Sequence, residues 1–176
     1  QAVYGDHGPA QHHRRIPPGA GPGRTAPERL WPDGDDRRAQ VCPRGGGGDF
    51  PRNTMVSPLS GVEQGEYFDV LPYAEEAGDY LMGIIKTVKL PRKLKVGFSN
   101  SLANVTHATF RDLGFVAKEE GTFDVYSAGG LGNNYRMGVK VAENVKPEEV
   151  LYYVEAMVRT FTTYGNYESR AKSRTR

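Results

Sequence analysis

The sequence contains very little cysteine: among 176 residues there is a single one, Cys42. One thiol forms no internal disulfide framework, and it cannot supply the four thiolates that a four-iron cluster takes. The sequence also lacks an apolar run long enough to cross a membrane and a charged-then-apolar leader for secretion. We therefore expect a cytoplasmic protein.

Neither sign of charge dominates, and the chain is short. Lysine and arginine number 23 against 21 aspartates and glutamates, which gives a net charge of +2. Bulk charge therefore does not indicate a nucleic-acid binder, and any anion site must be local. A length of 176 residues suits one domain with a core and is short for two.

Lysine is absent before Lys86, and the first part of the chain differs in composition from the rest. Up to Arg44 it is rich in arginine, glycine and proline without an apolar period, which is typical of disorder. GC-rich DNA translated in a wrong frame gives the same composition, so residues 1–46 are either a disordered leader or a frameshifted segment. We predict no metal site there, and we predict one domain over residues 47–176.

Apolar periodicity in residues 47–176 predicts an α+β domain. Spacings of three and four predict helices, and alternation predicts strands. Helices are expected over Glu66–Ile85, around Lys140 and over Pro147–Tyr164, with a left-handed stop at Gly165, and strands over 93–98, 114–117 and 122–128. Strands interleaved irregularly with helices, including a hairpin-like pair, indicate a mixed β-sheet with packed helices.

Two basic segments carry candidate site residues. The glycine-rich stretch 47–54 presents Arg52, although a surface loop with a solvated arginine has the same pattern. Lys93 and Lys95 are two positions apart, so on a strand they share a face about 7 Å apart. Two neighbouring ammonium groups need an anion between them on a half-buried strand, whereas on an exposed edge strand they merely discourage aggregation.

A glycine loop over residues 128–136 follows the third predicted strand. Glycines permit close backbone approach, successive N–H groups can form an anion nest, and Arg136 adds a positive charge. A plain glycine turn and a nucleotide-binding loop are the alternatives. The spacing matches neither the dinucleotide fingerprint nor a P-loop.

In their order and spacing, these segments resemble the sirohaem-dependent nitrite and sulfite reductases over Gly47–Arg176. The motifs that carry the resemblance are Gly48-Asp49-x-x-Arg52-Asn53, Pro58-Leu59-Ser60-Gly61, Leu90-Pro91-Arg92-Lys93-x-Lys95, Asp112-Leu113-Gly114-Phe115-Val116, Gly129-Gly130-Leu131-Gly132, and Tyr164-Gly165-Asn166 with Arg170-x-Lys172. The resemblance implies a domain that cradles sirohaem, a tetrapyrrole with eight carboxylates whose iron binds sulfite or nitrite.

The resemblance also implies roles for individual residues. Arg52, Lys93 and Lys95 match the catalytic cations that the family places over the distal face of the macrocycle, where they would hold the oxyanion and supply protons. The implied cofactor contacts are Arg52, Asn53, Lys93, Lys95, Gly129, Gly130, Gly132 and Arg136. Lys95 favours sulfite, because plant-type nitrite reductases of the family usually carry asparagine there.

The resemblance further implies a 4Fe-4S cluster bound by a later cysteine-rich half, and an electron donor such as ferredoxin or a flavoprotein. The cluster ligands are absent from this chain. We therefore expect a fragment that is inactive alone in the six-electron reduction of sulfite to sulfide or of nitrite to ammonia.

The alternative is a non-enzymatic module that binds RNA or another polyanion. It would use the basic strand at 92–95 and the basic tail from Arg170 to Arg176. Residues 47–176 carry no recognisable nucleic-acid motif, so we expect neither a nucleic-acid nor a membrane partner.

Overall fold

The computed structural model describes residues 47–52, 54–132 and 134–176. The predicted leader 1–46, which includes Cys42, and the predicted cofactor contact Asn53 lie outside the described residues. Within the described part, none of the helices has the length and apolar character needed to span a membrane.

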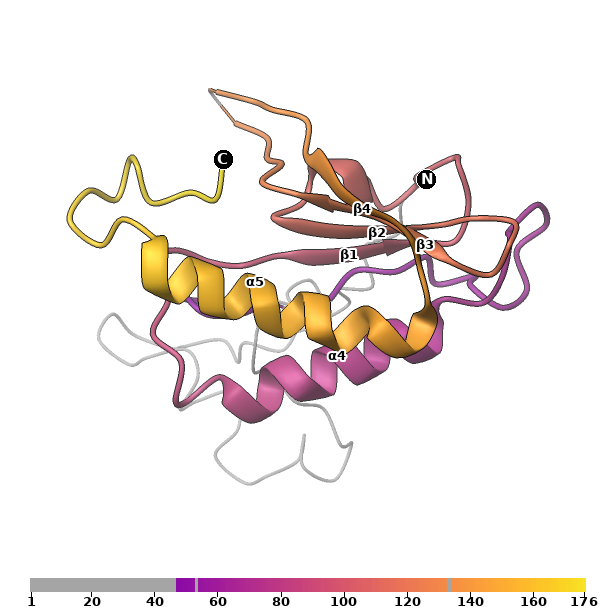
Figure 1. The fold of residues 1–176 in the computed structure, drawn as a ribbon, viewed down its shortest axis with the longest axis horizontal. Coiled ribbons are helices and arrows are strands. Elements are labelled where there is room, and N and C mark those ends of the chain that lie inside the picture. The colour runs from indigo at the N-terminus through magenta and orange to yellow at the C-terminus, as the bar shows by residue number, and fades with distance from the viewer. Residues whose placement is uncertain (1–46, 53, 133) are drawn as a thin grey trace, which may run out of the picture.

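Four strands form one mixed sheet in the order β1–β2–β3–β4, and two helices lie side by side on one of its faces (Figure 1). β1 and β2 are parallel, and the other neighbouring strands are antiparallel. The elements are α4 Leu71–Ile84, β1 Val96–Ser99, the 3₁₀ helix η1 Ala108–Phe110, β2 Leu113–Ala117, β3 Phe123–Ser127, β4 Val139–Val145, the 3₁₀ helix η2 Pro147–Glu149, and α5 Val150–Tyr164. The predicted α+β class is confirmed.

An aromatic core lies between the sheet and the helices. Its members Phe98, Phe115 and Phe123 stand on three neighbouring strands and are fully buried. The rings of Phe98 and Phe115 stack at 4.8 Å, and Phe123 meets both edge-on. Each buried ring contributes roughly 2–3 kcal/mol. The helices cover these rings with Ala74, Ala77, Leu81, Val150, Val154, Val158 and Phe161.

The first predicted helix begins at Leu71 instead of Glu66. Pro72 lies in its first turn, where a residue without an N–H group is tolerated. The carboxylate of Asp69 accepts the Leu71 N–H at 2.9 Å, and the carboxylate of Glu66 accepts the Gly61 N–H at 2.9 Å. The residues before Leu71 therefore form a hydrogen-bonded turn that leads into the helix.

The prediction of a helix around Lys140 was wrong, because this segment is strand β4. Lys140 lies opposite Tyr126 of β3, and its ammonium is 2.9 Å from the Asp124 carboxylate. β-Branched Val139 and Val141 favour a strand, but both side chains are exposed on the edge of the sheet. The inside–outside alternation that marks a half-buried strand is therefore missing.

The last predicted helix forms as η2 followed by α5, but the prediction of a left-handed Gly165 was wrong. Gly165 has φ −69° and ψ 149°, which is extended backbone. A Cβ atom at this position would lie 2.4 Å from the Phe161 carbonyl oxygen and 2.4 Å from Cγ of Pro91. Close packing therefore requires the glycine.

On the sheet face opposite the aromatic core, residues 108–111 cross over two glycines. Gly97 of β1 and Gly114 of β2 are register partners. A Cβ atom at Gly114 would lie 2.0 Å from the Ala108 carbonyl oxygen, and one at Gly97 would lie 3.0 Å from Cγ of Arg111. The missing side chains let η1 lie directly on the sheet, and this contact fixes the segment that leads to Asp112.

Candidate functional site

Backbone pairing places the three predicted catalytic residues on one face. Pro51 and Leu94 form a parallel bridge, in which the Arg52 N–H donates to the Leu94 carbonyl at 2.8 Å. Pro51 and Leu94 are buried. Because side chains alternate along extended chains, Arg52, Lys93 and Lys95 project from the opposite side. Lys93 and Lys95 are half-buried and Leu94 between them is buried, which agrees with a shared face for the two lysines although regular strand β1 begins only at Val96.

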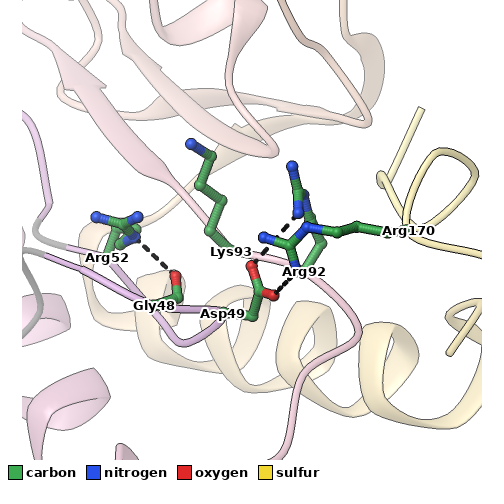
Figure 2. A pocket seen from close by; sticks show the side chains of 6 residues that line it. All are labelled: Gly48, Asp49, Arg52, Arg92, Lys93 and Arg170. Carbon is green, nitrogen blue, oxygen red and sulfur yellow. Dashed lines mark hydrogen bonds and ion pairs between the residues drawn. The ribbon is translucent and has the colours of Figure 1, made fainter.

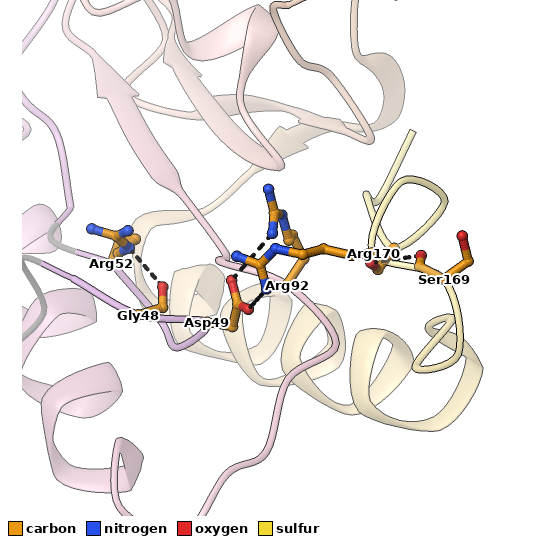
Figure 3. A network of polar contacts seen from close by, with 7 residues as sticks. Gly48, Asp49, Arg52, Arg92, Ser169 and Arg170 are labelled. Carbon is orange, nitrogen blue, oxygen red and sulfur yellow. Dashed lines mark hydrogen bonds and ion pairs between the residues drawn. The ribbon is translucent and has the colours of Figure 1, made fainter.

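Arg52 and Lys93 line a pocket of about 120 Å³ together with Gly48, Asp49, Arg92 and Arg170 (Figure 2). Asp49 lies between two arginines: its Oδ1 is 3.8 Å from Nη1 of Arg92, and its Oδ2 accepts a hydrogen bond from Arg170 (Figure 3). Among the described residues that line the pocket there are therefore one carboxylate and four cationic side chains, which is an excess of positive charge.

Further cations act on the two lysines from other segments. Burial lowers the pKa of Lys93 most, followed by repulsion from Arg52, Arg174 and Arg92. Burial also lowers the pKa of Lys95 most, followed by repulsion from Lys93, while Asp112 opposes the shift. We define the cationic site as Arg52, Arg92, Lys93, Lys95, Arg111, Arg170 and Arg174. An anion placed there would relieve this repulsion.

The positive charge of the cationic site is only partly neutralised, as the surroundings of Asp49 and Arg92 show. The hydrogen bond from Arg170 is the largest of the causes that hold the pKa of Asp49 below its ordinary value. In contrast, the buried Nε and Nη1 of Arg92 have no hydrogen-bond acceptor among the described residues. A buried donor without an acceptor costs free energy, so Arg92 is prepared to donate to a bound anion.

The predicted glycine loop forms a short hairpin whose first amides are engaged within the protein. The Gly130 N–H donates to the Arg136 carbonyl at 2.9 Å, and the Gly129 N–H donates to the Arg111 carbonyl at 3.0 Å. A nest at this loop would therefore depend on Gly132, whose φ is 121°, and on side chains. The Arg136 side chain is exposed and is not among the strongest charges acting on Lys93 and Lys95.

Sequence reasoning missed several residues that the fold brings to the site. Segment 169–176 returns to the sheet beyond α5 (Figure 1) and delivers Arg170 and Arg174. Nη1 of Arg176 donates to the Leu131 carbonyl at 3.1 Å, so the same segment lies against the glycine loop. The sequence features that pointed here were the basic composition of the tail and the motif Arg170-x-Lys172.

The side chains of the site distinguish between sirohaem and a 4Fe-4S cluster, the two cofactors that the resemblance implies. Excess guanidinium and ammonium groups suit a tetrapyrrole that carries carboxylates. An iron–sulfur cluster does not fit this chain, because its usual ligands are several cysteine thiolates and the sequence has one cysteine. In the part of the chain that the structure describes, no cluster of three or more His, Cys, Asp or Glu side chains could hold a metal ion.

Comparison with known proteins identifies the family of the chain. The model of the family described as "Nitrite and sulphite reductase 4Fe-4S domain" matches residues 47–176. Sulfite reductase (ferredoxin) 1 of Mycolicibacterium paratuberculosis is 34% identical over 131 residues, which cover 72% of this chain and 23% of that protein. Ferredoxin–nitrite reductase of Synechococcus elongatus is 28% identical over 138 residues, which cover 73% and 27%.

Among solved structures, the NirA protein of Mycobacterium tuberculosis superposes with a TM-score of 0.71 at 31% identity, covering 83% of this chain and 27% of that one. The chain therefore belongs to the nitrite and sulphite reductase family. It spans about a quarter of the length of the curated relatives it matches. The matched residues contain no cysteine, so the cluster in the family's description has no thiolate ligand among them.

Proposed function

We propose that residues 47–176 are the sirohaem-binding domain of a reductase that converts sulfite to sulfide with six electrons. The supporting observation is that Arg52 and Lys93 converge on one pocket with excess positive charge. Lys95, on the same face, favours doubly charged sulfite over singly charged nitrite because attraction scales with charge. Reduction of nitrite to ammonia is the alternative within the same family.

The chemistry of the site residues suits this reaction. Reduction of an oxyanion requires its charge to be held and each departing oxygen to be protonated to water. Arg52 can hold two oxygens with its planar guanidinium, while Lys93 and Lys95 offer compact charges. Because their pKa values are lowered, these ammonium groups release a proton more readily than free lysine does.

Cofactor binding follows from the same surplus of cations. Sirohaem, when bound, supplies the iron that takes the oxyanion and the route for electrons. Arg92, Arg170 and Arg136 would hold its carboxylates, and Asn53 and the glycine loop belong to the same proposed set. Electrons would come from ferredoxin or a flavoprotein through a cluster ligated outside this chain, so we expect the isolated chain to be inactive in turnover.

Reconstitution tests the proposal. The chain is titrated with sirohaem and followed by visible absorption, and sulfite binding is then measured by calorimetry. The double variant Lys93→Met/Lys95→Met should lose at least about tenfold in sulfite affinity, because two charge-assisted contacts disappear. The matched control Lys86→Met/Lys89→Met changes two exposed lysines and should bind as the wild type does. A wild-type chain that takes up neither sirohaem nor sulfite would refute the proposal.

One observation favours the polyanion-binding alternative. Arg174 acts on both Lys93 and Lys95, so the basic tail and the basic segment at 92–95 form one surface. A colourless chain that binds RNA with an affinity falling steeply with salt would support this function. Tight sirohaem binding with negligible RNA affinity would exclude it.

A further inference from the structure

Asp112, between η1 and β2, is a buried carboxylate that the proposed chemistry leaves without a role. Its side chain joins two parts of the candidate site. Oδ2 accepts the backbone N–H of Lys95 at 2.9 Å, and Oδ1 accepts the hydroxyl of Thr175 at 2.6 Å. The residue is 6% exposed. The basic segment and segment 169–176 therefore meet on one carboxylate.

The backbone of Asp112 joins a third part. Its carbonyl accepts the Ala128 N–H at 3.0 Å and the Ser127 hydroxyl at 3.3 Å, and the neighbouring Arg111 carbonyl accepts the Gly129 N–H. The glycine loop is thus anchored at the same point as the basic segment and the tail. A shift of Asp112 would move all three.

The position of Asp112 is itself tightly constrained. The preceding residues 108–111 lie against Gly97, where a Cβ atom would be in tight contact with Arg111, and against Gly114, where no side chain would fit. A Cβ atom at Gly129 would lie 2.7 Å from the Phe110 carbonyl carbon. The carboxylate is therefore held by a close-packed backbone.

The carboxylate of Asp112 also acts electrostatically on Lys95. Lys93, Arg111 and Arg174 face Lys95 and repel its ammonium, and Asp112 attracts it. Burial raises the pKa of Asp112, and this shift is opposed by the Thr175 hydroxyl, the Lys95 N–H and the charges of Lys95 and Arg174. A buried negative charge is costly unless it is paired, and the positive charges of Lys95 and Arg174 offset part of that cost for Asp112.

We propose that Asp112 is a positioning residue of the cationic site. Its carboxylate holds the Lys95 backbone and segment 169–176 in one place, and its charge keeps the Lys95 ammonium protonated among the neighbouring cations. The inference rests on the proposed function, because a proton on Lys95 serves only if Lys95 faces an oxyanion. Asp112 and Thr175 act through Lys95 and through Arg174, the neighbour of Thr175.

The test separates the charge of Asp112 from its hydrogen bonds, in the full 176-residue chain without ligand. Asp112→Asn keeps an acceptor for the Lys95 N–H and removes the charge. Thr175→Val keeps the shape of the side chain and removes the hydroxyl. Lysine Cε resonances, with Lys95 assigned through Lys95→Arg, report its titration, and backbone amide relaxation reports the order of residues 169–176.

The two variants should give opposite results. Asp112→Asn should lower the pKa of Lys95 and leave residues 169–176 ordered, whereas Thr175→Val should loosen them without lowering that pKa. An unchanged Lys95 titration in Asp112→Asn, or an equally ordered segment in Thr175→Val, overturns the proposal. A merely structural role would give no such division between charge and hydrogen bond.

A measurement on the wild type covers the case in which Asp112→Asn fails to fold. The Lys95 resonance should then show a second inflection at the pH where the Asp112 carboxyl titrates, and its absence overturns the inference. Sulfite affinity adds an independent readout: on the alkaline side, Asp112→Asn should bind at least about threefold more weakly than wild type, since more Lys95 has lost its proton. A wild-type chain that binds no sulfite defeats the proposed function alone, because the Lys95 titration still decides on Asp112.

Discussion

The aromatic core is built from side chains of the sheet strands, the cationic site is built from segments that flank those strands, and the two are organised on opposite principles. In the core, Phe98, Phe115 and Phe123 are fully buried and in mutual ring contact. In the cationic site, like charges lie close together, the pKa of both lysines is lowered, and the buried Nε and Nη1 of Arg92 find no acceptor within the described part of the chain. The core stabilises the fold. Repulsion among the cations of the site destabilises it, and a bound anion would relieve that repulsion.

Removing a core ring should have the largest effect on stability. Phe123→Ala deletes a side chain with no exposed area that touches four other rings. We expect a loss of about 3–5 kcal/mol in the free energy of unfolding, measured by urea denaturation followed by circular dichroism. Tyr152→Ala, at a side chain that is 75% exposed, should change it by less than about 0.5 kcal/mol. Equal losses in the two variants would contradict the assignment of the core.

Removing the negative charge of Asp49 should change the stability of the fold little and should raise the affinity of the pocket for sulfite. The pKa of Asp49 is lowered, with the Arg170 hydrogen bond as the largest cause, so its stabilisation is present above its ordinary value of 3.8 and is lost as the pH falls through the lowered value. Asp49→Asn should therefore cost less than about 1 kcal/mol near neutral pH. Sulfite affinity, measured by calorimetry, should rise because Arg92 and Arg170 are released, while exposed Glu119→Gln should leave it unchanged. A fall in affinity would show that Asp49 organises the pocket instead of competing with the ligand.

Removing a cation should cost the fold almost nothing. Arg92→Met deletes a largely buried guanidinium whose Nε and Nη1 lack acceptors among the described residues, so the free energy of unfolding should stay within about 1 kcal/mol or rise. Sirohaem retention, followed by absorption after gel filtration, should fall. Arg159→Met, at a side chain that is 78% exposed, should retain the cofactor. A strongly destabilised Arg92→Met protein would show that Arg92 stabilises the fold as a core residue does.

The smallest effect should come from alkaline titration. Because the folded-state pKa values of Lys93 and Lys95 lie below their ordinary value of 10.5, the unfolded chain binds more protons in the window just below that value. Stability should therefore rise with pH through this window. Subtracting the curve of Lys93→Met/Lys95→Met from that of the wild type removes the tyrosine contribution and isolates the rise. A flat difference curve would mean that the lysines are fully solvated.

The sequence predicted those elements whose apolar side chains face the core. Val150, Val154, Val158 and Phe161 recur at spacings of three and four and are buried along α5. β4 was not predicted because Val139 and Val141 are exposed on the sheet edge, where burial imposes no alternation. Gly165 was assigned a left-handed stop because a steric clash with Pro91, distant along the chain, cannot be seen in local sequence.

The candidate site, too, has features that local sequence predicts and features that it does not. The common face of Lys93 and Lys95 follows from their spacing, and Arg52 joins them through one backbone bridge. The sequence analysis included Asp112 in a motif and Arg174 in the basic tail, but it did not predict that these segments meet, since the hydrogen bond from Thr175 to Asp112 links positions 63 residues apart. Contacts of that range depend on how α5 returns the chain to the sheet, which no local pattern encodes. The roles of all these residues remain predictions.

The glycines beneath residues 108–111 give a criterion for deciding which homologous sequences can form the cationic site. A chain can keep every lysine and arginine of the cationic site and still fail to build it if Gly114 carries a side chain, because the Cβ atom would meet the Ala108 backbone and lift the crossing segment off the sheet. Homologues that retain the cations but replace this glycine should accordingly be set apart as a separate subgroup, with a different ligand to be sought for them.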